Sequence, residues 1–164
     1  IYAINSSGDD AVINILPADT FDTAALVKDN EGVISATNLT SVITLPLNEN
    51  TQGDANSIAI DENNNLLAVA MAAESTGDEG QIAFYDISGE SPVFIKNVTV
   101  GFLPDMVTFT HDGAKAVVAN EGEPSGDYSV DPEGSISIID ITNNVIADTA
   151  INIDFKAYNN KQTE

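Results

Sequence analysis

The sequence contains no cysteine, no tryptophan, one histidine and only five lysine or arginine residues among 164. Without cysteine it can form no disulfide, no thiolate metal site and no cysteine nucleophile. It also lacks an uninterrupted apolar run of about 18 residues, the minimum for a transmembrane helix. We therefore expect no membrane insertion of this segment.

The scarcity of basic residues leaves the charge strongly negative. Twenty-six Asp and Glu residues give a formal net charge of −21 at pH 7. Such a charge repels the phosphates of nucleic acids and anionic membrane surfaces, so neither is expected as a partner. The acidic residues are spread through turns rather than collected in a tail. Two explanations stay open: a surface adapted to high salt, or a protein neutralised by divalent cations outside the cell.

Short apolar runs between turn clusters make up most of the chain. Hydrophobic residues account for 43% of it, enough for a buried core. No stretch sustains the apolar spacing i, i+3, i+4, i+7 of an amphipathic helix, so the pattern predicts an all-β fold. The chain opens directly with such a run, Ile1–Ile4, and we expect the mature N terminus to lie further upstream.

These runs repeat with a period near fifty residues. Four antiparallel strands with tight turns in each repeat are typical of a β-propeller blade. The first three runs of the two copies align at offsets of 49, 49 and 54 residues, and each copy closes with a more polar strand: Ser57–Asp61 with Met106–Thr110, Leu67–Met71 with Ala116–Asn120, Gly80–Ile87 with Gly134–Ile141, and Val93–Val100 with Val145–Ile153.

The repeat predicts a fragment of a β-propeller with about two full four-stranded blades and a partial N-terminal blade. Propellers close with four to eight blades, so two apolar blade faces should need cover from remaining blades of the same protein or from another copy of the chain. A β-sandwich would also suit many short strands, but sandwiches do not need internal copies. The expected boundaries are a partial blade at 1–50 with an insertion at 17–40, blades at 51–101 and 102–155, and a tail at 156–164 that leads to missing blades.

Carboxylates gather in the longest loop between two predicted strands. In a propeller blade the loops before the first strand and between the second and third open on the usual ligand face. Carboxylates and backbone carbonyls supply the oxygens that calcium prefers, so we predict a calcium site here. The predicted ligands are Glu121, Glu123, Asp127, Asp131 and Glu133, with Asp105 and Asn120 as further candidates.

Other interpretations of these residues stay open. The spacing is not that of an EF-hand, and a solvated acidic loop or a protein contact would use the same composition. Asp105 would equally serve to cap its own turn. The single histidine, His111, is predicted in a turn on the opposite face, and neither a nucleophilic triad motif nor a P-loop is present. Catalytic residues therefore stay unknown.

Three segments closely resemble the choice-of-anchor I family: Leu103–Thr110, Val117–Ser125 and Asp131–Asp140. Members look like secreted or surface-displayed bacterial propellers with interchangeable C-terminal anchors, and some are fused to, or described as, metallophosphatases, nucleotidases or alkaline phosphatases. The resemblance implies an extracellular, periplasmic or cell-surface location. The shared motif includes Asn120, Glu121, Glu123, Asp131 and Glu133.

Our leading hypothesis is a binding or scaffold module for an unknown ligand, with a calcium-binding loop on its ligand face. The alternative is a metal-dependent phosphoesterase of the alkaline phosphatase-like kind. In that case the same carboxylates, joined by ligands from missing blades, would hold two or more divalent metals and polarise a phosphate ester.

Overall fold

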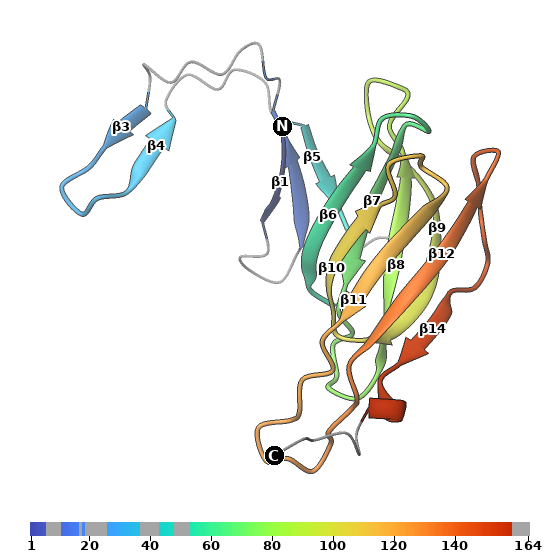
Figure 1. Cartoon of the computed structure of the whole chain (residues 1–164). Coiled ribbons are helices and arrows are strands. Elements are labelled where there is room, and N and C mark those ends of the chain that lie inside the picture. The colour runs from blue at the N-terminus through green and yellow to red at the C-terminus, as the bar shows by residue number, and fades with distance from the viewer. Residues whose placement is uncertain (6–10, 17, 19–25, 37–42, 48–52, 159–164) are drawn as a thin grey trace.

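The computed structural model of the chain describes residues 1–5, 11–16, 18, 26–36, 43–47 and 53–158. Parts of the expected insertion at 17–40 and the end of the expected tail, 159–164, lie outside these residues. Within the described ranges the structure is built from strands and contains no α-helix (Figure 1). None of the helical structure there is long and apolar enough to cross a membrane.

Three antiparallel sheets follow one another along the chain, which we call the N-terminal sheet, the middle blade and the C-terminal blade. The N-terminal sheet has the order β1-β2-β5, with β1 at Tyr2–Asn5, β2 at Val12–Ile15 and β5 at Ile43–Pro46. The middle blade has the order β6-β7-β8-β9, with β6 at Ala55–Asp61, β7 at Leu66–Met71, β8 at Glu79–Asp86 and β9 at Val93–Phe102. The C-terminal blade consists of β10 at Pro104–Phe109, β11 at Lys115–Asn120, β12 at Ser135–Thr142 and β14 at Ile151–Asp154, with the short β13, Val145–Ile146, beside the end of β12.

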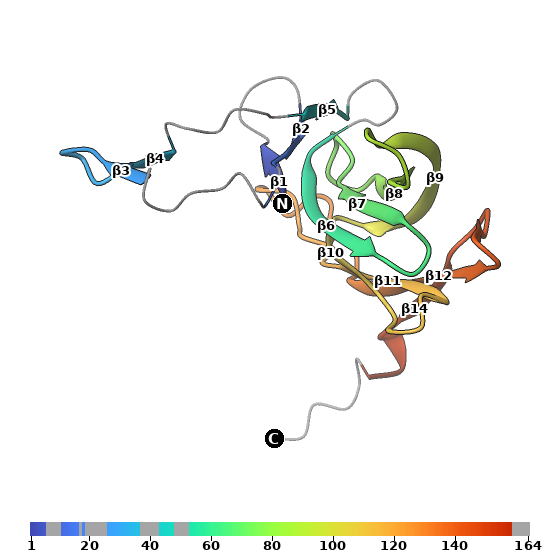
Figure 2. The ribbon, with the colours of Figure 1, turned by 90° about the horizontal axis from the view of Figure 1, so that it is seen from above.

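This topology confirms the predicted fold class: an all-β propeller fragment with two four-stranded blades and a partial N-terminal blade. Each full blade is a meander whose strands pair with their sequence neighbours, except that β14 rather than β13 continues the last blade. The innermost strands of the two blades, β6 and β10, lie side by side (Figure 2).

The middle blade is covered on both faces, which explains why β7 is an unbroken apolar run. All six residues of Leu66–Met71 are buried, as in strands packed between two layers. Because side chains alternate along a strand, Leu67, Val69 and Met71 face the N-terminal sheet and pack with Ile13. The other three face the C-terminal blade.

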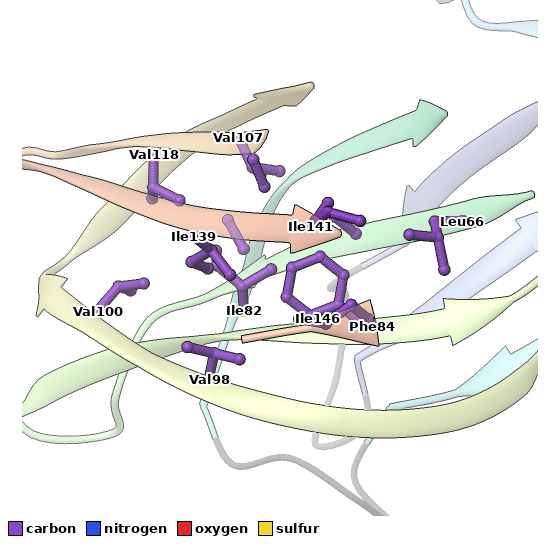
Figure 3. Close-up of a cluster of buried hydrophobic side chains, with 13 residues drawn as sticks. Leu66, Ile82, Phe84, Val98, Val100, Val107, Val118, Ile139, Ile141 and Ile146 are labelled. Atoms are coloured by element: carbon purple, nitrogen blue, oxygen red, sulfur yellow. The ribbon is translucent and has the colours of Figure 1, made fainter. Parts of the chain in front are cut away.

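Between the two full blades lies the larger of the two hydrophobic clusters (Figure 3). Ile82 and Phe84 of the middle blade pack there against Val118 and Ile139 of the C-terminal blade, and all four are fully buried. Phe84 also meets Phe109 edge to face, with ring centroids 6.5 Å apart. Burying one side chain of this size stabilises the fold by roughly 1.5–3 kcal/mol, so this interface is a major source of stability.

The turns between the first two strands of each blade interlock on the face opposite the candidate site. The carboxylate of Asp61, itself buried, accepts hydrogen bonds from the backbone N–H of Asn63 and from Asn64 Nδ2. Asn64 Nδ2 also donates to the carbonyl of Gly113 in the neighbouring turn, at 3.0 Å. His111 lies exposed in that same turn, on the face where the sequence placed it.

The outer strand of the C-terminal blade differs from the prediction of one strand at 145–153. Asn143 and Asn144 take left-handed φ values of 51° and 62°, and the tight turn that results lets β13 pair only with the end of β12. The chain then leaves the sheet, and Asp148 forms an ion pair with Lys96 of the middle blade. The strand is interrupted between Ile146 and Ile151, where the segment also contacts the middle blade through Lys96.

The segment predicted as an insertion contains a hairpin that the sequence analysis did not anticipate. Its strands are β3, Leu26–Lys28, and β4, Ile34–Ala36, and Figure 1 shows it apart from the three sheets. The carboxylate of Asp29 accepts the backbone N–H groups of Glu31 and Val33 and so closes the turn.

Candidate functional site

The candidate site lies where two loops of neighbouring blades meet. The loop between β7 and β8, residues 72–78, belongs to the middle blade, and the loop between β11 and β12, residues 121–134, belongs to the C-terminal blade. Both connect the second and third strands of their blades, so the repeat places them on one face. The link from β9 to β10, at Leu103, reaches the same face.

The two loops touch at Gly77. A Cβ at this position would lie 2.6 Å from Cγ1 of Val130, and the φ of Gly77 is +96°, a value that favours glycine. The longer loop is also pinned at its base. The backbone N–H of Glu121 donates to the carbonyl of Leu103 at 2.9 Å, and that of Gly122 to Phe102 at 3.2 Å. The loops therefore hold each other and the inter-blade link in place.

These contacts leave a small cleft, which we call the inter-blade cleft, with a volume of about 110 Å³. The apolar part of its lining comes from Ala73, Phe102, Leu103, Pro124 and Pro132. The lining contains no lysine, arginine or histidine. Its remaining residues can supply oxygen ligands: Glu74, Ser75, Thr76, Gly77, Asp78 and Glu123.

One residue with a strained backbone lines this cleft. Among the described non-glycine residues with positive φ, three are asparagines in turns, which tolerate that conformation. The other two are Leu103, with φ 49°, and Tyr128, with φ 57°. Leu103 lines the cleft, and Tyr128 is exposed at the tip of the longer loop. Such residues persist only where the surroundings impose the conformation, and they cluster at binding sites.

The five predicted carboxylate ligands are separated by the structure. Glu123 lines the cleft, together with Glu74 and Asp78 of the other blade. Glu133 lies on a different side and pairs with Lys156 at 3.6 Å. Glu121 and Asp131 are exposed and line neither hollow.

Asp127, the fifth of these residues, holds the tip of its own loop together. Its Oδ1 accepts hydrogen bonds from the hydroxyls of Ser129 and Ser125, both at 2.8 Å, and from the backbone N–H of Ser129 at 3.1 Å. Hydrogen bonds to the charged form, above all from the Ser129 hydroxyl, lower the pKa of Asp127 to about 2. The Oδ1 atom of Asp127 therefore accepts its hydrogen bonds from within the loop.

The two further candidates occupy different surroundings. Asp105 is exposed and lies in a β-bulge of β10, where its repeat counterpart in β6 is Asn56. Asn120 is buried, and its Nδ2 donates to Ser137 Oγ at 2.8 Å and to Ser135 Oγ at 3.0 Å. The Oδ1 of Asn120 has no hydrogen-bond partner in the described part of the chain. Neither residue lines the cleft.

Within the described residues, no three Asp, Glu or His side chains are already gathered as a metal site. The carboxylates that do face one hollow come from two loops, and the sequence analysis missed Glu74 and Asp78. The repeat carried the signal that could have found them, because it places residues 72–79 at the position that 121–133 occupies in the next blade.

Comparison with known proteins identifies the family. No curated protein matches the chain. Among solved structures it is similar to the periplasmic gluconolactonase PpgL of Pseudomonas aeruginosa, with 20% sequence identity and a TM-score of 0.49 over 92% of this chain. The chain spans 36% of the length of that protein. The family model of the choice-of-anchor I domain matches residues 17–164, and the chain therefore belongs to the choice-of-anchor I family.

Proposed function

We propose that this chain is part of an extracellular or cell-surface propeller that acts as a binding module, and that the inter-blade cleft binds calcium. The observation that carries the proposal is the lining of the cleft: three carboxylates from two blades and no basic side chain. Membership of the family supports a location outside the cytoplasm, in the periplasm or at the cell surface. We propose in addition that the whole module recognises a ligand that is still unknown. Either the remaining blades of the same protein or a second copy of the chain would complete the module.

The donor set suits calcium better than a softer metal. Calcium takes six to eight oxygens from carboxylates, carbonyls and water, and the cleft offers Glu74, Asp78 and Glu123 beside the hydroxyls of Ser75 and Thr76. The three carboxylates are not yet gathered, so binding would have to draw the flexible glutamates inward. Since the two loops already touch at Gly77, an ion held between them would order both.

The phosphoesterase alternative receives less support from this cleft. A phosphate ester is anionic, and the cleft lining contains no lysine or arginine to hold it. The net charge of −21 opposes the approach of such a substrate unless several metals compensate. Binding is therefore the function that the geometry favours.

A calcium titration of the chelator-treated protein by calorimetry tests the proposal, with thermal melting followed at the same fixed ionic strength. We expect saturable binding and a melting temperature that rises with calcium, because a ligand of the folded state stabilises it. Heat that merely tracks ionic strength would indicate salt adaptation and contradict the proposal. Phosphatase activity with 4-nitrophenyl phosphate that depends on added metal would favour the alternative.

A further inference from the structure

A second hollow lies between the third and fourth strands of the two full blades, and we call it the outer hollow. Its volume of about 400 Å³ is typical of a small-ligand site. On the middle blade it is lined by Glu79 and Phe102, which lie opposite each other on β8 and β9. On the C-terminal blade it is lined by Ser135 and Asp154, a cross-strand pair of β12 and β14. Both sides therefore belong to blades that this chain contains.

Two neutral hydrogen-bond donors of the outer hollow are held in place from behind. The hydroxyl of Ser137 donates to Asn152 Oδ1 at 2.5 Å, which orients the amide of Asn152 and leaves its Nδ2 group as a donor. Asn120 Nδ2 donates to Ser135 Oγ at 3.0 Å, which leaves the hydroxyl proton of Ser135 as a second donor. Ser135 and Asn152 both line the hollow. A ligand there meets donors whose positions are already set.

The charged residues of the outer hollow add acceptors and one cation. Lys156 Nζ lies 3.6 Å from Glu133 Oε2 and 3.9 Å from Asp154 Oδ2. All three side chains are more than half exposed, and ion pairs of this length and exposure are weak. With Glu79, the lining has three carboxylates, which accept hydrogen bonds, and one ammonium group, which donates them. Donors and acceptors therefore lie together in one hollow.

This combination fits a neutral, hydroxyl-rich ligand better than an ion. A hydroxyl group both donates and accepts, so neighbouring hydroxyls can bind a carboxylate and the Asn152 amide at once. An anion would be repelled by the three carboxylates. A cation would leave the donors of Ser135 and Asn152 unused, and it would compete with Lys156 for two of the acids. Phe102 adds a flat apolar surface, which suits the C–H side of a sugar ring.

We propose that the outer hollow binds a neutral pyranose sugar. Asn152 Nδ2 and the Ser135 hydroxyl donate to hydroxyl oxygens of the sugar. Glu79 and Asp154 accept from its hydroxyl groups, and the ring packs on Phe102. This assignment names the ligand class of the module and rests on the proposed binding function. It does not depend on calcium, because the carboxylates of the inter-blade cleft line a different hollow.

An NMR titration of the ¹⁵N-labelled 164-residue chain tests the assignment. The neutral probes are the methyl glycosides of glucose, galactose and mannose, and the charged probes are glucuronate and glucosamine. We expect at least one neutral glycoside to shift the side-chain amide of Asn152 saturably, with a Kd on the order of 1 mM for a ligand of this size. The free hexoses are titrated alongside. A preference for the glycosides supports a sugar at the end of a glycan, and a preference for the hexoses supports a soluble sugar.

The Asn152→Asp variant removes the proposed donor with the least change of shape. It keeps an oxygen that accepts the Ser137 hydroxyl and replaces Nδ2 by a second carboxylate oxygen, so sugar binding should weaken at least about tenfold. Asn144→Asp, in the exposed turn before β13, makes the same chemical change away from the hollow and should leave binding unaltered. Glu79→Gln, at an exposed position on the other blade, should also weaken binding and guards against a purely structural effect of the change at Asn152.

Titrations with calcium and with chelator separate this assignment from the calcium proposal. Sugar binding should be the same in both, and a protein that binds sugar but no calcium would contradict the calcium proposal alone. No saturable shift with any neutral sugar, or binding of the charged probes only, would overturn the assignment. Equal effects of Asn152→Asp and Asn144→Asp would also overturn it. Sugar shifts that appear only with calcium would place the sugar on the ion in the cleft and reject the outer hollow.

Discussion

The backbone N–H of Gly101, near the end of β9, donates to the hydroxyl of Ser137, on β12 of the next blade, at 3.2 Å. The same hydroxyl accepts Asn120 Nδ2 at 2.8 Å and donates to Asn152 Oδ1 at 2.5 Å. Ser137 is fully buried. One serine therefore joins four segments of the chain, from both full blades.

Replacing this serine tests its role as a junction. Ser137→Ala removes a hydrogen bond from all three partner groups, two of which, Gly101 N–H and Asn120 Nδ2, belong to buried residues, and we expect the free energy of unfolding to fall by about 1–3 kcal/mol. Urea denaturation followed by circular dichroism measures the change, with the exposed Ser91→Ala as control. A loss no larger than that of the control would mean that water replaces the hydroxyl without cost.

The contact between the loops depends on Gly77. Gly77→Ala would force a methyl group against Val130 at a φ of +96°, so we expect a stability loss of about 1–2 kcal/mol and weaker calcium binding. Gly126→Ala is the matched control, because it lies in the same loop system and a methyl group there would have nothing within 4 Å. Equal effects of the two variants would contradict a specific role for the Gly77 contact.

A calcium site in the inter-blade cleft and a calcium site in the longer loop alone predict different effects of substitutions. If the cleft is the site, Glu123→Gln and Glu74→Gln should each weaken calcium binding by roughly tenfold, about 1.4 kcal/mol, through the loss of one charged ligand. Asp131→Asn should have a smaller effect, since Asp131 is exposed and does not line the cleft. Calorimetric calcium titrations of the three variants distinguish the two sites. If Asp131→Asn weakens calcium binding most, the site lies in the longer loop alone.

The tip of the longer loop should be stable to strong acid. The hydrogen bonds from Ser129 and Ser125 hold the pKa of Asp127 at about 2, below its ordinary value near 3.9. The stabilisation is therefore complete above about pH 4 and lost as the pH falls through 2. The amide chemical shift of Ser129, followed by NMR from pH 5 to 1.5, should titrate with a midpoint near 2. A midpoint near 4 would show that the loop tip is open in solution.

Tyr85 is the corresponding group at high pH. Burial raises the pKa of Tyr85 to about 12, and its hydroxyl has no hydrogen-bond partner in the described part of the chain. Since the folded pKa lies above the ordinary value near 10, the folded state keeps its full stability below pH 10 and loses stability as the pH rises through 12, because the unfolded chain ionises more readily.

The Tyr85→Phe variant checks this assignment. It should be at least as stable as the parent at pH 7, because the ring still packs edge to face on Phe94 at 5.6 Å while the unpaired hydroxyl is removed. It should also lose the last step of the ultraviolet phenolate titration. A destabilisation above about 1 kcal/mol would indicate a hydrogen bond to the hydroxyl that the described residues do not show.

Much of the fold could be predicted because apolar residues alternate along each strand of the repeat. The pairs aligned at 49 and 54 residues all form strands at those positions, and the apolar run of β7 lies buried between two layers as its composition requires. The break between β13 and β14 could not be predicted, because the ion pair of Asp148 is made with Lys96, about fifty residues earlier. The pattern of a single strand carries no information on such a contact.

The candidate site was predicted only in part, for a related reason. Composition alone identified the acidic loop at 121–133, since carboxylates between Gly and Pro are visible in one dimension. Which of them share a hollow depends on side-chain direction and on the neighbouring blade. Only in the folded chain does Asp127 bond to Ser129 and Glu133 pair with Lys156, while Glu123 lines the same cleft as Glu74 and Asp78.

The sequence by itself therefore determined the class, the period and the strand positions of this protein, because local alternation of apolar side chains dictates which segments pair and which faces are buried. The tertiary structure decided which carboxylates meet, where the outer strand of the C-terminal blade breaks and which backbone at the cleft is strained. Those properties arise from contacts between residues distant in sequence, and packing two blades together creates them.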